Sequence, residues 1–351
     1  MVTIKDVARR AAVSPSTVSR VIAGSNRISL QTKLRVQQAM EELNYVPNAI
    51  ARSLARSHTR TIGFTVARQA DEAFANPFFS EVMRGMSTVA QARDYNILLS
   101  INPSVEEEQE KCMRLIKERR VDGLIVSTSR MKDRLIDALA EEQIPFVLIG
   151  RSAEKPVLSV NNDNVQAART ATIHLFEQGY ERVLFLGGDR RLVVTQDRLA
   201  GYKQACYEWQ REYDEAYALE AEFSIEGGYR ALLEAKEREI AFDAVLAADD
   251  LLALGALKYA ETSHFRVPEQ LGVVGFNDSP LLSFVSPPMT SVRILAYELG
   301  IEAMELLIDT LEKPAKAGMK KEILLPSELI VRASSVRSGG KTFSRGVPTN
   351  E

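Results

Sequence analysis

The sequence predicts a small all-α headpiece followed by a larger α/β body of two lobes, and two observations lead to this fold class. Residues 1–60 contain ten Lys or Arg but only three Asp or Glu, a net charge of +7, whereas the remaining residues contain 34 basic and 44 acidic side chains and carry −10. From residue 61 onward, strand-like and helix-like segments alternate, as parallel sheets with helices on both faces require. A basic module joined to an acidic body suggests a reader of a polyanion attached to a unit that controls it.

Three short helices are expected in the basic module. Apolar residues at helical spacing predict a helix near 4–11. Ser14 followed by Pro15 is a strong helix start, because the hydroxyl accepts a bond from a free backbone N–H and Pro has no N–H to lose; it predicts a helix over 15–23. Ser29 caps a third helix with an apolar side. This order matches the helix-turn-helix plan.

The second helix is expected to carry the reading face. Its aliphatic side chains face inward, whereas Ser16, Thr17, Ser19 and Arg20 face outward. These polar side chains fit a DNA groove, and a guanidinium can bind guanine O6 and N7 in a bidentate manner. The alternative is a generic three-helix bundle with a solvated basic face, which the charge and the cap together disfavour.

Residues 47–56 are expected to be a conditional helix. Pro47 can open a helix, but the segment is shorter than the roughly 12–15 residues that an isolated helix needs in water. The polar linker Ser57-His58-Thr59-Arg60-Thr61 follows it. We expect this helix to order only when DNA and a second copy of the chain hold it.

The acidic body is too long for one small core and contains about ten strands, which favours two lobes. Strands are expected at 62–66, 96–101, 121–126, 145–150, 183–187, 217–223, 244–248, 272–276 and 321–331. Helices are expected at 79–93, 106–119, 131–142, 164–178, 196–210, 227–238, 250–262 and 296–312.

The N-terminal motifs resemble the DNA-binding headpiece and hinge of the lactose/galactose-repressor (LacI/GalR) family. The residues that carry the resemblance are Thr3-Ile4-Lys5-Asp6-Val7-Ala8, Val13-Ser14-Pro15-Ser16-Thr17-Val18-Ser19-Arg20-Val21, Asn44-Tyr45-Val46-Pro47-Asn48, Ala51 and Leu54-Ala55. Ala12 stands where members often place Gly or Asn; if the backbone there needs a positive φ, Ala costs roughly 1 kcal/mol more than Gly.

The resemblance implies specific DNA contacts. Positions matching Pro15, Ser16 and Arg20 read major-groove bases in the family, and the position of Leu54 is a wedge that opens a base step from the minor groove. The plainer alternative makes Leu54 a core residue of the hinge. The candidate DNA-binding residues are Thr3, Ser14, Pro15, Ser16, Thr17, Ser19, Arg20, Arg27, Ser29, Thr32, Tyr45, Asn48, Arg52 and Leu54.

The body also resembles this family, whose regulatory region is a two-lobed fold similar to type I periplasmic sugar-binding proteins. The matching motifs are Asn76-Pro77-Phe78-Phe79, Val121-Asp122-Gly123, Arg198-Leu199-Ala200-Gly201-Tyr202, Ala248-Asp249-Asp250, Leu254-Gly255-Ala256, Gly275-Phe276-Asn277-Asp278 and Pro287-Pro288-Met289-Thr290-Ser291-Val292. Crossovers between the lobes are expected near 156–160, 290–294 and 313–321.

The expected domains follow from these motifs: a helix-turn-helix domain at 1–46, a hinge helix and linker at 47–61, an effector-binding and dimerisation domain at 62–340, and a disordered tail at 341–351. Within the third, the lobes are expected at about 62–157 plus 293–318 and at about 160–290 plus 321–335.

Candidate effector-binding residues stand at strand ends, where doubly wound sheets bind ligands. They are Phe78, Phe79, Arg151, Arg198, Asp249 and Asn277. An aromatic ring can stack on a sugar face, and the polar groups suit vicinal hydroxyls. Three alternatives stay open: Phe79 belongs to the core, Arg198 makes an interlobe ion pair, and Asp250 is a helix N-cap.

Catalysis finds little support. Three scattered His residues, at 58, 174 and 264, form no Ser/Cys–His arrangement and no metal-ligand spacing. Cys112 and Cys206 are expected on separate helices as reduced thiols. Gly187-Gly188-Asp189 lacks the spacing of a dinucleotide fingerprint. No catalytic residue, cofactor or metal is therefore predicted.

A sugar-binding receptor without a DNA role is the rival from another class. It would need a signal peptide, and Met1-Val2-Thr3-Ile4-Lys5-Asp6 contains no apolar stretch; no segment is long enough to span a membrane. It also leaves the +7 module unexplained.

We therefore expect a cytoplasmic, homodimeric, sequence-specific DNA-binding regulator that represses a carbohydrate-utilisation operon. Its partners would be a near-palindromic double-stranded operator and a small-molecule effector, with a saccharide favoured and no membrane. The run 186–198 is similar to maltose-operon repressors of Gram-positive bacteria, which favours a maltose or maltodextrin type. The alternative within the family is a response to a non-sugar metabolite or a protein co-repressor.

Overall fold

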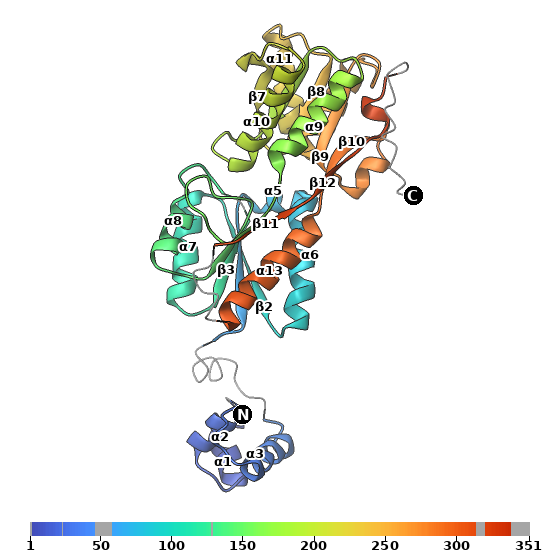
Figure 1. Ribbon diagram of the computed structural model, residues 1–351. Helices are drawn as coiled ribbons and strands as arrows, with labels where there is room; N and C mark the ends of the chain where they lie inside the picture. Colours follow the sequence, from blue (N-terminus) through green and yellow to red (C-terminus); the bar gives the residue numbers. More distant parts are fainter. Residues whose placement is uncertain (1, 23, 46–57, 128, 314–319, 338–351) are drawn as a thin grey trace, which may run out of the picture.

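The computed structural model describes residues 2–22, 24–45, 58–127, 129–313 and 320–337 (Figure 1). The predicted hinge helix at 47–56 and the tail at 341–351 lie outside the described residues. The described chain forms a three-helix headpiece and a body built on two six-stranded sheets.

The headpiece contains α1 (Ile4–Arg10), α2 (Pro15–Ile22) and α3 (Leu30–Glu42), which confirms the three expected helices. Its core is formed by side chains such as Val7, Val18 and Val36, which are fully buried. Ala12, in the turn between α1 and α2, has a φ of 49°. This is the left-handed conformation that would favour Gly there, so the strain expected from the sequence is present.

The first lobe is a doubly wound sheet with the strand order β11-β5-β4-β3-β1-β2, in which all five pairings are parallel. Its strands are β1 (Thr61–Ala67), β2 (Asn96–Asn102), β3 (Gly123–Val126), β4 (Phe146–Ile149), β5 (Ser159–Asn162) and β11 (Glu322–Leu325). Its helices are α5 (Ala70–Ala75), α6 (Pro77–Ala92), α7 (Val105–Lys117), α8 (Arg134–Glu141) and α13 (Ala296–Glu312).

The second lobe repeats this plan with the order β12-β10-β9-β8-β6-β7, and only the β10–β12 pairing is antiparallel. Its strands are β6 (Val183–Gly187), β7 (Ala218–Glu220), β8 (Ala244–Ala247), β9 (Gly272–Asn277), β10 (Thr290–Ile294) and β12 (Ser327–Ile330). Its helices are α9 (Asn164–Glu177), α10 (Val193–Glu208), α11 (Ile225–Glu237) and α12 (Asp250–Thr262), with short 3₁₀ turns at Glu215–Tyr217, Pro280–Ser283 and Ala333–Ser335.

The chain passes between the sheets three times: between β5 and α9, between β10 and α13, and between β11 and β12. The single strand expected at 321–331 is wrong. Pro326 separates β11 from β12, and the two halves pair in different sheets, so the third crossover falls after the expected 313–321. Proline has no N–H to give to a ladder, which suits it to the point where the chain leaves one sheet for the other.

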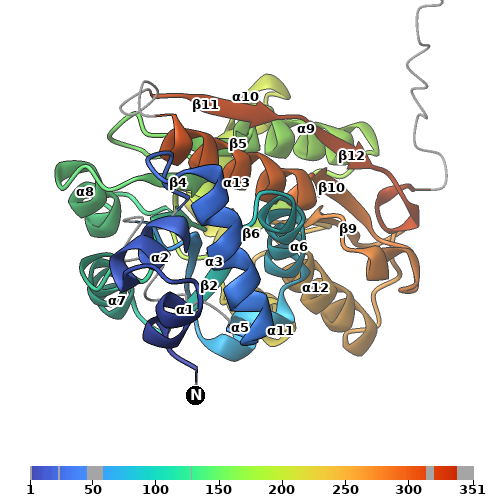
Figure 2. The same cartoon turned by 90° about the horizontal axis from the view of Figure 1, so that it is seen from below.

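Helices α6 and α13 pack closely side by side on one face of the first sheet (Figure 2). Gly85 and Gly300 make this contact possible. A Cβ atom on Gly85 would come within 2.0 Å of the Tyr297 carbonyl oxygen, and one on Gly300 within 2.1 Å of the Val82 carbonyl oxygen. Only glycine allows the two backbones to approach this closely.

The described linker end is fastened to the first lobe by Asp122, which lies just before β3. The Asp122 carboxylate accepts bonds from the Thr59 N–H at 2.7 Å, the Thr59 hydroxyl at 2.9 Å and the Arg60 N–H at 2.8 Å. The Arg60 guanidinium donates to the Arg93 carbonyl oxygen and lies over the Tyr95 ring. The chain that leads to the headpiece therefore starts from a fixed point on the first lobe.

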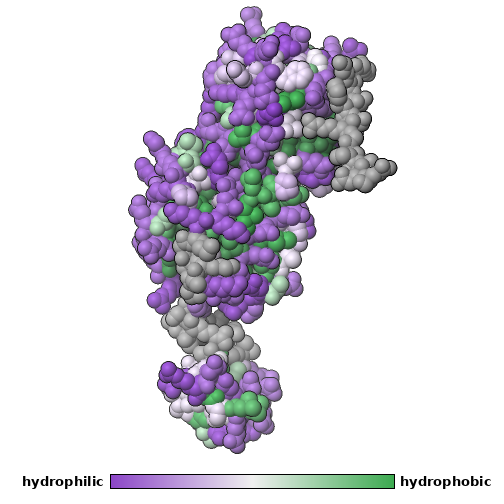
Figure 3. All heavy atoms as spheres, viewed as in Figure 1, coloured by the Kyte–Doolittle hydropathy of each residue, from purple (hydrophilic) through white to green (hydrophobic). Residues whose placement is uncertain are grey.

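The visible surface is mostly hydrophilic, with a narrower hydrophobic strip across the first lobe (Figure 3). Among the described helices, none combines the length and the apolar character that a bilayer crossing demands.

Candidate functional site

The outer face of α2 is the candidate DNA-reading surface. The Ser14 hydroxyl accepts a bond from the Thr17 N–H at 3.1 Å and lies 2.8 Å from the Ser16 hydroxyl and 2.9 Å from that of Thr17. Pro15 opens the helix, and Pro15, Ser16 and Arg20 are exposed. Residues four apart lie on the same face of a helix, so Ser16 and Arg20 present one polar surface.

The headpiece cations divide into two groups. Arg10 pairs with Glu42 at 2.5 Å, and the Arg35 guanidinium donates to the Ala11 carbonyl oxygen at 2.6 Å. Within the described part of the chain, no ion pair involves Arg20 or Arg27. These two guanidiniums are therefore available for phosphates or base edges.

The remaining headpiece candidates stand at helix ends. The Thr3 hydroxyl donates to Asp6 at 2.7 Å and closes a capping box at the start of α1. Ser29 caps α3 by accepting from the Thr32 N–H at 3.3 Å, and Tyr45 packs against the headpiece core. Ser19 is partly buried on α2. Asn48, Arg52 and Leu54 lie outside the described residues.

The six candidate effector residues converge on one cavity between the lobes, here called the cleft cavity, of about 760 Å³ including its open mouth. Its walls come from both sheets, at the ends of β1, β4, β5, β8 and β9 and from α6 and α10. The residues that line it are Arg68, Asn76, Phe78, Phe79, Ser127, Ser129, Ile149, Gly150, Arg151, Asn161, Asn162, Asn164, Val193, Val194, Asp197, Arg198, Phe223, Asp249, Asn277, Ile294 and Leu299.

Asp249 is the centre of the polar network in this cavity. One carboxylate oxygen accepts from the Leu251 N–H at 2.7 Å, so Asp249, and not Asp250, is the N-cap of α12. The other oxygen accepts from the Asn277 amide at 2.9 Å and from the Asn76 amide at 3.0 Å. Because Asn76 belongs to the first lobe, this oxygen joins the two lobes. Burial raises the pKa of Asp249 above its ordinary value.

Arg198 is a buried cation whose position is fixed by other groups of the second lobe. Its Nε donates to the Asn164 side-chain oxygen at 3.0 Å, its Nη1 donates to the Ala248 carbonyl oxygen, and its guanidinium lies 4.2 Å above the Phe276 ring. Burial lowers the pKa of Arg198 to about 10, although the carboxylate of Asp249 favours the charged form. A buried guanidinium in a cavity wall is a strong donor for a hydroxyl or carboxylate. The alternative of an interlobe ion pair is wrong for Arg198.

Arg151 makes the interlobe ion pair instead. Its Nε donates to one Asp197 carboxylate oxygen at 2.8 Å, and its Nη2 donates to the other. The Asp197 side chain is 7% exposed and that of Arg151 is 41% exposed. This hydrogen bonding raises the pKa of Arg151. The pair joins the end of the first sheet to α10 in the wall of the cavity.

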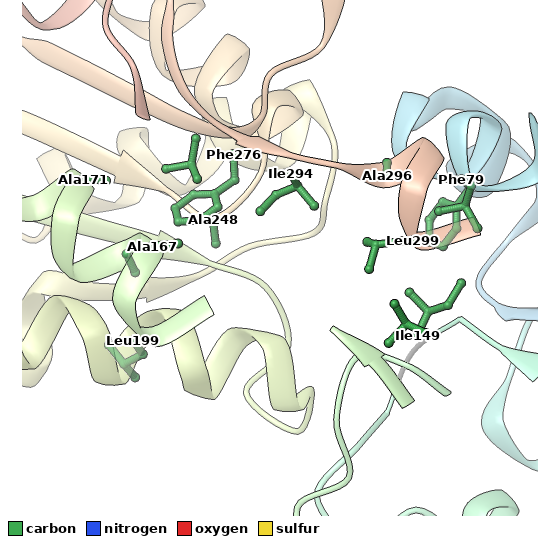
Figure 4. Close-up of a cluster of buried hydrophobic side chains, with 14 of the residues drawn as sticks. Phe79, Ile149, Ala167, Ala171, Leu199, Ala248, Phe276, Ile294, Ala296 and Leu299 are labelled. Carbon is green, nitrogen blue, oxygen red and sulfur yellow. The ribbon is translucent and has the colours of Figure 1, made fainter. Parts of the chain in front are cut away.

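The apolar wall of the cleft cavity is built from both lobes. Phe79, Ile149 and Leu299 line it from the first lobe, and Val193, Val194 and Phe223 line it from the second. In the core cluster that supplies several of these side chains, Phe79, Ile149 and Leu299 gather on one side and Phe276 and Ala248 on the other, with Ile294 between them (Figure 4). Phe78 and Phe79 meet edge to face, with ring centroids 5.4 Å apart. Phe79 is 8% exposed and belongs to the core, which was the alternative stated for it above. It also lines the cavity.

Sequence reasoning missed several polar lining residues. Asn161 and Asn162 lie on β5, a short buried strand whose polar Ser-Val-Asn-Asn sequence does not show the apolar pattern of a central strand. Asn164 holds Arg198, as described above. The buried Ser127 hydroxyl has no hydrogen-bond partner among the described residues, which leaves it available to a ligand. Arg68 follows β1 and has no motif that would mark it.

The chemistry of the cleft cavity is that of a binding site. Amides, carboxylates, hydroxyls and a guanidinium converge beside an apolar wall, which suits a polyhydroxylated ligand. His174 lies elsewhere, with its Nε2 2.7 Å from the Ser335 hydroxyl. Cys112 on α7 and Cys206 on α10 are buried free thiols. In the described residues, no three His, Cys, Asp or Glu side chains form a group able to hold a metal.

Comparison with known proteins agrees with this arrangement. Residues 3–48 match the family model described as bacterial regulatory proteins, lacI family, and residues 172–335 match the periplasmic binding protein-like domain. The chain is 39% identical over 310 residues to the HTH-type transcriptional regulator MalR of Streptococcus pneumoniae, covering 88% of this chain and 92% of MalR. The chain belongs to the lacI family of bacterial regulatory proteins.

Other lacI-family proteins give the same result. The regulator CelR of Thermobifida fusca is 34% identical over 335 residues, covering 95% of this chain and 98% of CelR. A solved CelR–cellobiose complex has a TM-score of 0.74 at 33% identity, covering 95% of this chain and all of that chain. A lac repressor dimer bound to operator and the anti-inducer ONPF has a TM-score of 0.82 at 27% identity, covering 96% and 99%.

This lacI-family chain is therefore a DNA-binding transcriptional regulator with a helix-turn-helix headpiece and a two-lobed α/β body similar to periplasmic binding proteins. The predicted family and fold class are confirmed. The prediction that the chain is not an enzyme is confirmed by its relatives, which are transcriptional regulators.

Proposed function

We propose that this regulator represses a carbohydrate-utilisation operon, with a maltose or maltodextrin type favoured, and that a saccharide bound in the cleft cavity controls its affinity for the operator. The observation that carries the proposal is the convergence of polar groups from both lobes on one cavity with an apolar wall. MalR and CelR among the relatives, and cellobiose in the CelR complex, support a sugar.

The proposed domains are those expected from the sequence: a reader at 1–46, a hinge and linker at 47–61, and the effector-binding unit at 62–340. Pro15, Ser16 and Arg20 are proposed to read base edges in the major groove, and Leu54 to open a base step in the minor groove. The other headpiece candidates are proposed to position the headpiece on the DNA backbone. Because its relatives are transcriptional regulators, the chain is proposed to act in the cytoplasm.

The proposed control is a linkage between lobe closure and DNA binding. A saccharide that bonds to Asp249 and Arg198 competes with, or adds to, the bonds that already tie the lobes together. Its differential affinity for two lobe arrangements shifts their populations. A typical coupling of about 1–3 kcal/mol would change operator affinity by roughly 5–150-fold.

A homodimer is proposed as the DNA-binding unit, and an apolar groove of about 1630 Å³ that spans both lobes supports it. Ile225 and Leu281 line the groove and are 41% and 64% exposed. Large apolar side chains that gather in an exposed groove mark an association surface. The lac repressor dimer bound to operator is a related precedent.

The dimer surface can be tested with a matched pair of variants. Leu281→Ser should weaken self-association, because it removes an exposed apolar side chain from the groove. Tyr207→Ser is the control, since Tyr207 on α10 is 85% exposed but lies outside the groove. Light scattering over a dilution series measures the dimer fraction. Equal dimer fractions in both variants would show that the groove is not the dimer interface.

The proposed effector is tested by ligand binding followed by DNA binding. Saccharides and other metabolites are screened by thermal shift, since a ligand at about 100 times its Kd stabilises the folded state by about 2.7 kcal/mol. A positive saccharide is then added to the protein on DNA selected from a random pool, and operator affinity is measured. If only a non-sugar metabolite changes the melting temperature and the operator affinity, the alternative of a non-sugar effector would be favoured.

Asp249→Asn provides the matched variant for this experiment. Asparagine has the same shape and keeps an oxygen for the Leu251 N–H, but it removes the charge that the Asn76 and Asn277 amides face. We expect this variant to bind operator normally and to lose the response to the saccharide. A normal response would remove Asp249 from the effector site.

A further inference from the structure

A second cavity opens beside the cleft cavity, and is here called the side cavity. It encloses about 810 Å³ including its open mouth. Arg68, Glu72 and Arg130 line it from the first lobe, and Asp189, Glu222 and Phe223 from the second. Arg68 and Phe223 line both cavities, so the two spaces share one wall.

That shared wall is the Arg68 side chain held between two rings. Its guanidinium lies 4.7 Å from the centroid of the Phe223 ring and 5.4 Å from that of Phe79. Across the ranges that the structure describes, no hydrogen bond or ion pair fixes this guanidinium. Burial lowers the pKa of Arg68, while the carboxylates of Asp249 and Glu72 favour its charged form. The two rings and the attraction of these carboxylates hold the guanidinium without a directional bond, so it can move without breaking a hydrogen bond.

The side cavity is lined by polar groups of both signs. The Nη1 atom of Arg130 is buried without a hydrogen-bond partner among the described residues, and its nearest acid is Glu108 at 3.5 Å. Burial, with the facing charge of Glu222, raises the pKa of Glu72. The Glu222 carboxylate accepts one bond, from the Arg230 guanidinium at 3.2 Å, whereas both carboxylate oxygens of Asp189 accept from Arg191. Alternating carboxylates and guanidiniums beside a phenyl ring bind neutral vicinal hydroxyls.

We propose that the side cavity binds the second and later sugar units of a neutral oligosaccharide whose first unit occupies the cleft cavity, and that Arg68 is the movable partition between the two. This proposal rests on the proposed carbohydrate effector and adds that this effector contains two or more sugar units. A ligand of two or more units displaces the guanidinium from between Phe79 and Phe223 and places its own ring against Phe223. Arg68 thereby determines which chain lengths the regulator senses.

The first test measures chain-length dependence by calorimetry on the full chain with glucose, maltose and maltotriose. Wild type should bind maltose or maltotriose at least about tenfold more tightly than glucose, because the added unit gains hydrogen bonds in the side cavity. Glu222→Gln should reduce this gain about fivefold or more and leave glucose affinity unchanged. Glu234→Gln is the control, since Glu234 also faces an arginine but lies on α11 away from both cavities.

The second test removes the partition. Arg68→Ala should raise the ratio of maltose affinity to glucose affinity about tenfold, because two ring contacts no longer need to be broken. Lys203→Ala is the control, since Lys203 lies 4.3 Å from the Tyr213 ring on the outside of α10. Equal affinity for the three sugars in wild type, or an unchanged ratio in Arg68→Ala, overturns the extended site alone. If none of the three sugars binds, the maltose or maltodextrin effector of the proposed function fails as well.

Discussion

Breaking the Arg151–Asp197 pair should open the lobes of the unliganded protein. The pair is bidentate and charge-assisted, which makes it worth about 1.5–3 kcal/mol in a buried setting. Because the Arg151 side chain is 41% exposed, solvent screening reduces this to about 1–2 kcal/mol. A change of about 1.4 kcal/mol shifts the ratio of closed to open molecules tenfold.

The two single variants should differ, because the partners are buried to different degrees. Arg151→Ala leaves the Asp197 carboxylate, 7% exposed, without its cation, so opening the lobes is the way to hydrate it. Asp197→Ala leaves an arginine that already reaches solvent. We therefore expect Arg151→Ala to favour the open arrangement more strongly, and the double variant to show less than the sum of the two.

The assay is a distance measurement between one label on each lobe. The native thiols do not interfere, because Cys112 and Cys206 are buried and burial raises the pKa of Cys112 to about 11. Labels attached to two introduced surface cysteines report the interlobe distance distribution with and without saccharide. If both single variants keep the wild-type distribution, or if their effects add, the pair does not hold the lobes closed.

Three further predictions concern the headpiece and the core. Arg20→Ala should weaken binding to operator by about 1–3 kcal/mol and leave random DNA unaffected, measured by fluorescence anisotropy with Arg9→Ala as control; equal losses on both DNAs would contradict base reading. Ala12→Gly should stabilise the headpiece by up to about 1 kcal/mol by relieving its positive φ, seen as slower amide exchange in α1 and α2; unchanged or faster exchange would contradict the strain at this position. Burial lowers the pKa of His174 from 6.5 to about 4. The contribution of the neutral His174 to the free energy of unfolding is therefore present above pH 6.5 and is lost as the pH falls towards 4. Wild type should lose about 2 kcal/mol of unfolding free energy between pH 7 and pH 5 from this group, and His174→Gln should show a flatter profile; identical profiles would exclude it.

Local chemistry made most of the fold predictable. Ser14 with Pro15 and Ser29 marked helix starts correctly, because a cap depends only on residues within one turn. The error at 321–331 came from a non-local cause. Residues on either side of Pro326 pair with strands of different sheets, and no local pattern shows which partner a strand finds.

The part of the candidate effector site that stands at strand ends could be predicted from the sequence. Asp249 and Asn277 follow β8 and end β9, so the rule for doubly wound sheets identified them. Which groups meet across the lobes was not predictable: Arg151, and not Arg198, spans them. The place of Arg68 in the site could not be predicted from the sequence, because it depends on two rings that the packing of two separate sheets brings together.

The attachment of the linker at Asp122 determines what one copy of this protein can signal. Thr59 and Arg60 are bound to the first lobe, so closing the lobes of a single copy moves the second lobe and leaves the origin of the DNA-binding arm where it was. In a pair whose second lobes are held together, the same closure would carry the two first lobes, and both arm origins, towards or away from each other. The signal would then be a separation between two anchors, a quantity that a monomer does not possess.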